Sequence, residues 1–317
     1  MDWVSALLDG PRAEGVFVIR CLLEAPWAIS VRDEAPLTVV AVVRGQGWLT
    51  QGGAPVHLTP GSVVLVTGPE HYSVTSATDL EPDIVIHPGQ RCETLAGEPL
   101  AMSMRLGVRS WGHSADASTV LVTATYAHHS TITDALLATL GSPAAVHLPP
   151  DHRLLALLAD ELTRDDPGQQ ALLDRLVDAL TIDAIRAWCT DLADGAPPWW
   201  QGRHDPIVGE VLRLIHDEPN RAWTIASLAR TVGTSRANLA RRFTEVVGEP
   251  VIRYLTDWRL SLAADLVTRP GATVANVAAQ VGYSSPFALS TAFKRRYGLS
   301  PLQHRIATHG SRTALGA

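Results

Sequence analysis

The chain has 317 residues, of which 46% are hydrophobic, and a formal net charge of −6. This length favours two domains, and the apolar fraction excludes a chain that is disordered throughout. The first residues lack the pattern of a signal peptide, and no apolar run is long enough to span a membrane, so we expect a cytoplasmic protein with no membrane contact.

Charge is distributed unevenly between the two parts of the chain. Residues 1–203 carry 12 Arg, no Lys and 24 Asp+Glu, whereas residues 204–317 carry 13 Arg, 1 Lys and 8 Asp+Glu. This asymmetry predicts an acidic part joined to a nucleic-acid-binding part, and it confines DNA contact to the C-terminal part because phosphate repels acidic surfaces. Three cysteines are too few for a disulfide scaffold.

The first part of the chain is rich in short β-type runs separated by Gly and Pro. Such a pattern predicts an antiparallel sandwich or barrel. The predicted strands are Val16–Cys21, Ala28–Val31, Leu37–Val43, Gly47–Leu49, Val63–Val66, Ile84–Ile86 and Val120–Thr125.

The hydrophobic period then changes from that of strands to that of helices. Leucine stripes over 153–164 and 169–189 predict two amphipathic helices. They exceed what a small barrel needs as cover, so we expect a homodimer contact at about 151–190, with packing inside the domain as the alternative. We therefore divide the chain into a sensor domain (1–195), a linker (196–204) and a DNA-binding domain (205–308).

The C-terminal part contains an internal repeat. Thr224–Ser235 aligns with Thr273–Ser284 with six of twelve positions identical, and Leu239, Phe243 and Gly248 then match Leu289, Phe293 and Gly298. Each copy predicts a helix, a turn at a glycine and a second helix, which is a helix-turn-helix. A connecting helix of roughly 18 residues spans about 27 Å, which sets the two second helices about one DNA turn, roughly 34 Å, apart.

The second helix of each copy is the one expected in the major groove of double-stranded DNA. Arg side chains grip guanine or phosphate there, whereas Leu239 and Phe243, like Leu289 and Phe293, are expected in the core. Arg259 is expected to be a structural ion-pair partner. The candidate DNA-binding residues are Arg236, Asn238, Arg241, Arg242, Ser285, Phe287, Ser290, Thr291, Lys294 and Arg295.

The region 205–305 resembles the DNA-binding domain of the AraC/XylS family of transcription regulators. The resemblance rests on 223–229, 235–243, Trp258-Arg259-Leu260 and 282–301. It implies a sequence-specific regulator of transcription, with RNA polymerase as an expected partner. Thr291, Pro286 and Phe287 depart from the family pattern, so we expect Arg241 of the first unit to read bases directly and the second unit to read them weakly.

The N-terminal half is similar to the cupin-like ligand-binding domains of one branch of that family. Arg44–Leu49, Leu58–Val66 and His71 carry this resemblance, which implies a small-molecule effector inside the barrel. The strand Leu37–Val43 lacks the His pair of a cupin metal site, so we expect no metal and no cofactor. The candidate ligand-binding residues, with a plain core role as the alternative for the Trp residues, are Trp27, Trp48, His71 and Trp111.

These patterns together predict an α+β protein. A cupin-like barrel or sandwich with following helices is joined to an all-α domain with two helix-turn-helix units, and the whole acts as an effector-controlled transcription regulator. The sequence contains no catalytic motif that we recognise, so an enzyme is not expected. Three alternatives stay open: an oxidant sensor acting through Cys21, a cupin enzyme tethered to DNA, and an architectural DNA binder without effector. Cys21 as a small buried residue is the competing interpretation of that thiol.

Overall fold

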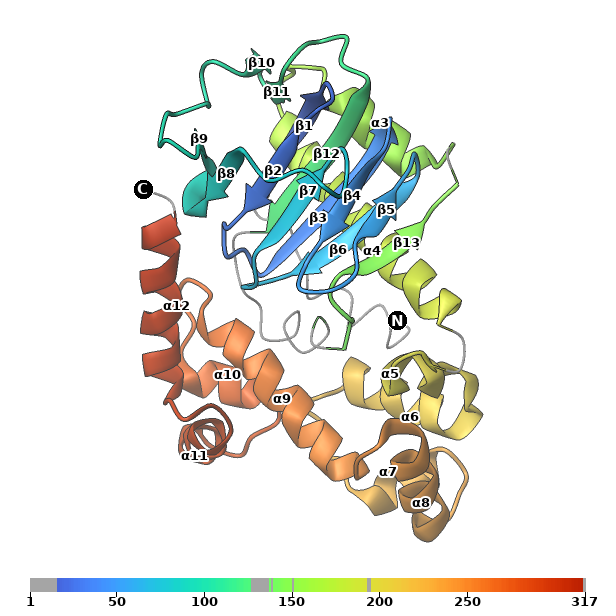
Figure 1. The fold of residues 1–317 in the computed structure, drawn as a ribbon. Helices are drawn as coiled ribbons and strands as arrows, with labels where there is room; N and C mark the ends of the chain where they lie inside the picture. The colour runs from blue at the N-terminus through green and yellow to red at the C-terminus, as the bar shows by residue number, and fades with distance from the viewer. Residues whose placement is uncertain (1–15, 127–136, 138, 150, 193–194, 316–317) are drawn as a thin grey trace. The chain divides into compact units, whose positions relative to one another are not determined.

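The computed structural model describes residues 16–126, 137, 139–149, 151–192 and 195–315, and it divides into two compact units (Figure 1). One unit is formed mainly by residues 192–314 and the other by residues 12–129 and 140–191. Each is described by itself below. A search of the described residues finds no helix with the length and apolarity needed to cross a membrane.

The N-terminal unit is built from two β-sheets. The seven-stranded sheet has the order β10 (Arg105–Gly107), β11 (Ser110–Gly112), β1 (Phe17–Leu23), β12 (Thr119–Tyr126), β3 (Leu37–Arg44), β6 (Ser62–Thr67) and β13 (Ala144–His147). The six-stranded sheet has the order β5 (Val56–Leu58), β4 (Gly47–Thr50), β7 (Tyr72–Thr75), β2 (Ala28–Val31), β8 (Ile84–His87) and β9 (Arg91–Thr94).

All seven predicted strands are present, which confirms the β-rich reading of this region. The six strands that the sequence did not reveal are β5, β7, β9, β10, β11 and β13. Each has only three or four residues, which leaves little length for hydrophobic alternation, although β2, β4 and β8 have four residues each and are among the predicted strands. Their partners on neighbouring strands, rather than local pattern, hold them in place.

The hydrophobic core of this unit lies between the two sheets. Leu23 and Val42 from one sheet and Leu49 from the other are completely buried there. The outer face of the larger sheet is covered by α3 (Arg153–Glu161) and α4 (Gln169–Asp191), which contact β3, β6 and β13. Six of the eight residues of β3 are therefore buried, and the strand is apolar on both faces.

The leucine stripes of α3 and α4 pack mainly inside the domain. Leu158, Leu173 and Leu180 are buried, and the Tyr126 hydroxyl lies 3.0 Å from Thr181 Oγ1 of α4. Leu157 and Leu172 stay exposed, at 47% and 44%. Packing within the domain, the alternative to a dimer contact, thus accounts for most of the apolar face.

The C-terminal unit is helical among its described residues. It contains α5 (Pro198–Gln201), the 3-10 segment η3 (Gly202–His204), α6 (Pro206–Asp217), α7 (Ile225–Thr231), α8 (Arg236–Val247), α9 (Val251–Val267), α10 (Val274–Gln280), α11 (Pro286–Tyr297) and α12 (Pro301–Leu315). The segment expected as a linker thus holds α5 and η3, which contact α6 and α8. Figure 1 shows α9 running between α7–α8 and α10–α11.

The internal repeat extends from sequence into packing. Phe243 and Phe293 are each 0% exposed, as predicted for core residues. Tyr254 of α9 meets the Phe243 ring edge-on at 5.7 Å, and His304 of α12 meets the Phe293 ring in the same way at 5.5 Å. The helix that follows each helix-turn-helix therefore closes its core with an aromatic side chain.

One ion pair fixes α8 to the beginning of α6. Asp205 caps α6 by accepting hydrogen bonds from the backbone N–H groups of Ile207 and Val208, each 2.9 Å long. Its second carboxylate oxygen accepts a 2.5 Å hydrogen bond from Arg242 Nε of α8. Burial raises the pKa of Asp205, but the hydrogen bonds from Val208, Arg242 and Ile207 outweigh it, and the net pKa lies below the ordinary value of 3.8.

We predict that Asp205→Ala lowers the free energy of unfolding of the C-terminal unit by about 1–3 kcal/mol, because both the cap and the Arg242 partner are lost. Asp205→Asn, which keeps a capping oxygen without the charge, should cost less. A carboxyl with a lowered folded-state pKa stabilises above its unfolded pKa, and this contribution is lost as the pH falls through the folded pKa. Urea unfolding followed by circular dichroism measures both effects; equal costs for the two variants would contradict a role for the ion pair.

Candidate nucleic-acid interface and effector cavity

The exposed face of α8 is the first candidate surface for DNA. Ser235 begins the helix, and its hydroxyl accepts a hydrogen bond from the backbone N–H of Asn238 at 3.1 Å. Because Leu239 and Phe243 point into the core, the polar residues on the opposite side of the helix are turned outward. Arg236 and Arg241 are exposed on that outer side, as a groove-reading helix requires.

A continuous polar line runs along this face. Asn238 donates through Nδ2 to Thr234 Oγ1 at 2.8 Å, and its Oδ1 accepts from Arg241 Nη2 at 3.1 Å. Arg241 Nη1 lies 2.7 Å from a Glu245 carboxylate oxygen, with the arginine side chain 61% exposed. A guanidinium has five N–H donors, so Arg241 keeps donors for a base while Glu245 and Asn238 hold its orientation.

Arg242 is directed away from this line. Its Nε is committed to Asp205, a residue 37 positions earlier in the chain. Arg242 is one of the candidate DNA-binding residues, and this ion pair favours a structural role instead. The sequence did not reveal the pairing because Asp205 and Arg242 are brought together only by the packing of α6 on α8.

The equivalent face of α11 has different chemistry. The Ser285 hydroxyl accepts from the backbone N–H of Ala288 at 3.1 Å, and Phe287 is 81% exposed in the first turn. Thr291 stands where the first unit has Arg241, and Arg295 stands where it has Glu245. α11 contains no acidic residue, and its last turn carries three basic ones. The remaining candidates on this helix are Ser290, which is half-buried, and Lys294, which is exposed.

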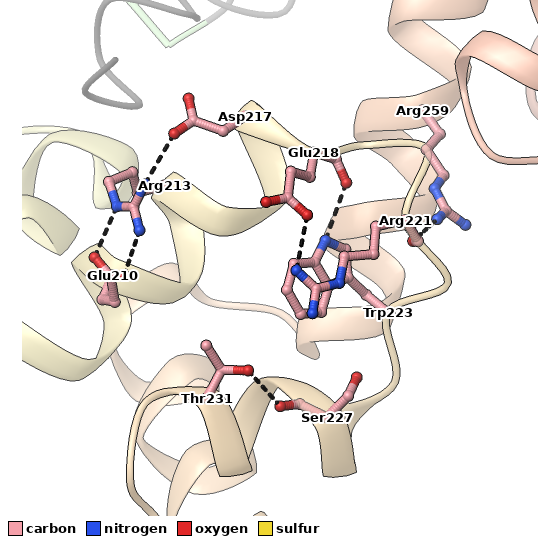
Figure 2. Close-up of polar contacts among 9 residues, drawn as sticks. All are labelled: Glu210, Arg213, Asp217, Glu218, Arg221, Trp223, Ser227, Thr231 and Arg259. Carbon is pink, nitrogen blue, oxygen red and sulfur yellow. Dashed lines mark hydrogen bonds and ion pairs between the residues drawn. The ribbon is translucent and has the colours of Figure 1, made fainter.

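Arg259 of α9 holds the loop between α6 and α7, and Figure 2 shows its contact with Arg221. Its Nε donates to the carbonyl of Pro219 and its Nη2 to the carbonyl of Arg221, each at 2.7 Å. We expected an ion-pair partner, and the structure gives Arg259 a structural role with backbone carbonyls in place of a carboxylate. A Cβ on Gly282 would lie 2.8 Å from Asn220 Cα and 2.9 Å from Arg259 Nη2, so the turn of the second unit closes directly on this contact.

Other contacts in Figure 2 stiffen the same loop between α6 and α7. The Arg221 guanidinium lies over the Trp223 ring at 4.1 Å, and Trp223 Nε1 donates to the Glu218 carbonyl at 3.0 Å. On α6, Arg213 forms ion pairs with Glu210 and Asp217. The side chains before the first helix-turn-helix are therefore engaged in holding its frame.

Arg305 performs the corresponding task after the second unit, and the sequence analysis missed it. Its Nε donates to the carbonyl of Val267 at 2.6 Å, and its Nη2 donates to the carbonyl of Ala272 at 2.7 Å. These carbonyls lie at the end of α9 and in the loop before α10, whereas the carbonyls held by Arg259 lie in the loop between α6 and α7. The repeat in the sequence gave no signal for Arg305, because Arg259 and Arg305 are not at matching positions.

The N-terminal unit contains a cavity between its sheets with a volume of about 40 Å³. Its lining is mostly apolar, with Cys21 and several polar groups among the aliphatic side chains. The lining residues are Cys21, Ile29, Val31, Asp33, Val40, Tyr72, Val74, Ile86, Gln90, Leu121, Thr123 and Thr125.

The four ligand-binding candidates lie outside the lining of this cavity. Trp27 and Trp111 are buried in the core, which is the alternative we named for them. Trp48 is half-buried against the His57 ring at 4.5 Å, and His71 is exposed. The sequence did not reveal Asp33 as a lining residue. It stands between Arg32 and Glu34, and such a charged run is typical of an ordinary surface turn.

Cys21 lies in the core with Cys92 nearby. Burial raises the pKa of the Cys21 thiol to about 12, against a smaller lowering by a hydrogen bond with Thr123. Burial likewise raises the pKa of Cys92 to about 11. Within the described ranges, no three His, Cys, Asp or Glu residues are placed to hold a metal ion.

Comparison with known proteins gives matches to both units. A family model described as Cupin matches residues 2–190, and a model described as Helix-turn-helix domain matches residues 228–306. An AraC-like transcription regulator of Streptomyces lividans is 31% identical over 290 residues, which cover 88% of this chain and 90% of the relative. The HTH-type transcriptional regulator MtrA of Neisseria gonorrhoeae is 26% identical over 316 residues, 96% of this chain and 98% of the relative.

Among solved structures, the DNA-binding domain of the global transcriptional factor AdpA, in complex with a target DNA, is 29% identical. The match covers 34% of this chain and 97% of the AdpA domain, with a TM-score of 0.33. The family assignment rests on the sequence matches, which confirm the resemblance and the two-part fold inferred above. This chain belongs to the AraC-like transcription regulators and is a DNA-binding protein with a cupin domain followed by a helix-turn-helix domain.

Proposed function

We propose that this protein is a sequence-specific transcription regulator whose DNA binding is controlled by a small molecule in the cavity of the cupin domain. The observation that carries the proposal is the pair of outward-facing helices, α8 and α11, each presenting basic side chains beside a fully packed core. Control follows from a population shift, in which the effector binds one arrangement of the protein better than another.

The proposal includes a division of labour within the chain. The sensor domain (1–195) receives the effector, and the domain 205–308 contacts DNA, with 196–204 between them. A homodimer through the exposed Leu157 and Leu172 of α3 and α4 would double the number of reading helices. RNA polymerase is the proposed partner at the promoter, since a bound regulator acts by changing transcription. No enzymatic activity is proposed, because the relatives are named as regulators.

Selection of genomic DNA fragments by the full-length protein, followed by footprinting, tests this function. We expect protected sites with two sequence elements about one helical turn, roughly 34 Å, apart, repeated if the protein is a dimer. The spacing follows from α9, whose 17 residues separate the two units. Failure to enrich any sequence, with and without added effector candidates, would support an architectural DNA binder instead.

Arg241→Ala should reduce affinity by about 1–3 kcal/mol and relax preference at one base pair, because the held guanidinium is proposed to read a base edge. Binding measured against a panel of operator variants checks this prediction. A loss of the same size on every sequence would make Arg241 a phosphate contact.

Lys294→Ala is the matched control on the second helix. Here we expect uniform weakening across sequences and a salt slope reduced by about one, since the ammonium neutralises one phosphate. A loss restricted to particular sequences would show that α11 reads bases through Lys294.

The proposal gives no oxidant-sensing role to Cys21. With a pKa of about 12, only on the order of 10⁻⁵ of this thiol is ionised at neutral pH, and the thiolate is the reactive form. We predict that iodoacetamide labels Cys21 of the native protein far more slowly than Cys21 of the urea-unfolded protein. Rapid labelling of the folded protein at neutral pH, followed by mass spectrometry, would revive the oxidant-sensor alternative.

A further inference from the structure

The cavity between the sheets carries one charged group. Of its twelve lining residues Asp33 is the single ionisable acid or base with a formal charge at neutral pH, and it is 7% exposed. No Lys, Arg or His lines the cavity. The neighbouring Arg32 is exposed, and its Nε donates to Ser30 Oγ at 3.1 Å rather than to Asp33.

The partners of Asp33 among the described residues are neutral. Its Oδ1 accepts from the backbone N–H of Ala35 at 3.2 Å, and its Oδ2 accepts from Gln90 Nε2 at 3.0 Å. A carboxylate offers about four lone-pair sites, so roughly two remain for a further donor. A buried carboxylate with only neutral donors gains most from a cation, because charge-assisted hydrogen bonds are the strong ones.

Tyr72 lies in the same electrostatic environment, on the strand β7 that pairs with β2 in the six-stranded sheet. Burial is the main cause that raises the pKa of its phenol, and the negative charge of Asp33 raises it further. The cavity is thus a negative site with aliphatic walls formed by Ile29, Val31, Val40, Val74, Ile86 and Leu121.

Gln90 is the residue of the cavity lining that donates a side-chain hydrogen bond to Asp33. It is half-buried, it lines the cavity, and its amide spans from η1 (Pro88–Gln90) to Asp33. Gln90 has a φ of +60° and Glu34, next to Asp33, has a φ of +56°, although neither is a glycine. Strained backbone on both sides of one hydrogen bond is typical of ligand clamps and switches.

We propose that the effector is a small apolar molecule with a protonated amine, and that the amine replaces Gln90 on the Asp33 carboxylate. This inference rests on the proposed effector control and names the chemical class of that effector. A volume of about 40 Å³ holds little more than water, so the Gln90 side chain has to leave for the apolar part of the ligand to enter. Carboxylic acids are excluded by repulsion from Asp33.

Three probes of equal chain length, hexylamine, hexanol and hexanoic acid, test the proposal with the full-length protein by calorimetry. We expect hexylamine to bind at least about tenfold more tightly than hexanol, since the ion pair adds a charge-assisted hydrogen bond. Hexanoic acid should give no binding. Equal binding of amine and acid by the wild-type chain, or no binding of any probe, would overturn the proposal without reference to a variant.

Asp33→Asn keeps the shape of the side chain and removes its charge. It should abolish the preference for the amine, whereas Asp79→Asn, at an exposed acidic position, should leave the preference unchanged. Gln90→Ala should strengthen binding of hexylamine, because no side chain has to be displaced, and should keep the preference over the acid. An amine preference that survives in Asp33→Asn would place the binding group elsewhere.

The outcome also separates this inference from the proposed function. If footprinting finds specific sites whose occupancy responds to an effector that is not an amine, the regulator stands and the ligand class is wrong. If hexylamine binds at Asp33 but DNA affinity is unchanged, the cavity is a ligand site and the proposed effector control fails.

Discussion

The helix-turn-helix domain depends on two hydrogen bonds from one guanidinium. Arg259 holds the carbonyls of Pro219 and Arg221, and so it fixes the loop between α6 and α7 against the long helix α9. Gly282 closes on the same place, because any side chain there would collide with Asn220 and Arg259. The first unit, the connecting helix and the turn of the second unit therefore meet at one contact.

The two reading helices have the same kind of core packing, but their outer faces carry different side chains. In α8 an acid, an amide and a hydroxyl orient Arg241, which costs some of its attraction to phosphate and gives it a defined direction. In α11 the corresponding positions hold Thr291 and Arg295. The helix itself contains no acidic residue, and of its basic residues Arg296 pairs with Asp257 of α9 at 3.8 Å. An oriented arginine suits base recognition, whereas unrestrained cations suit phosphate, because phosphate contacts need charge more than direction.

The cupin domain shows how a core and a binding cavity are made from the same strands. Cys21, Ile29 and Leu121 belong to the hydrophobic cluster between the sheets and also line the cavity. The burial that packs these residues also raises the pKa of Cys21, so the cavity is unfavourable for thiolate chemistry. It leaves Asp33 as the group with which a ligand can pair.

The sequence by itself determined seven of the strands, the longer helices up to α11 and the repeated helix-turn-helix, since these depend on periodicity and on local caps such as Ser235. It also located the exposed candidates on α8 and α11, because core residues at fixed spacing decide which side faces outward. Only the tertiary structure decided that Arg242 pairs with Asp205, that Trp27 and Trp111 are core, and that Asp33 faces a cavity. Each of these contacts is made by residues that are distant in the chain. Their energies arise from burial and from contact between separate elements, so a local sequence pattern cannot predict them.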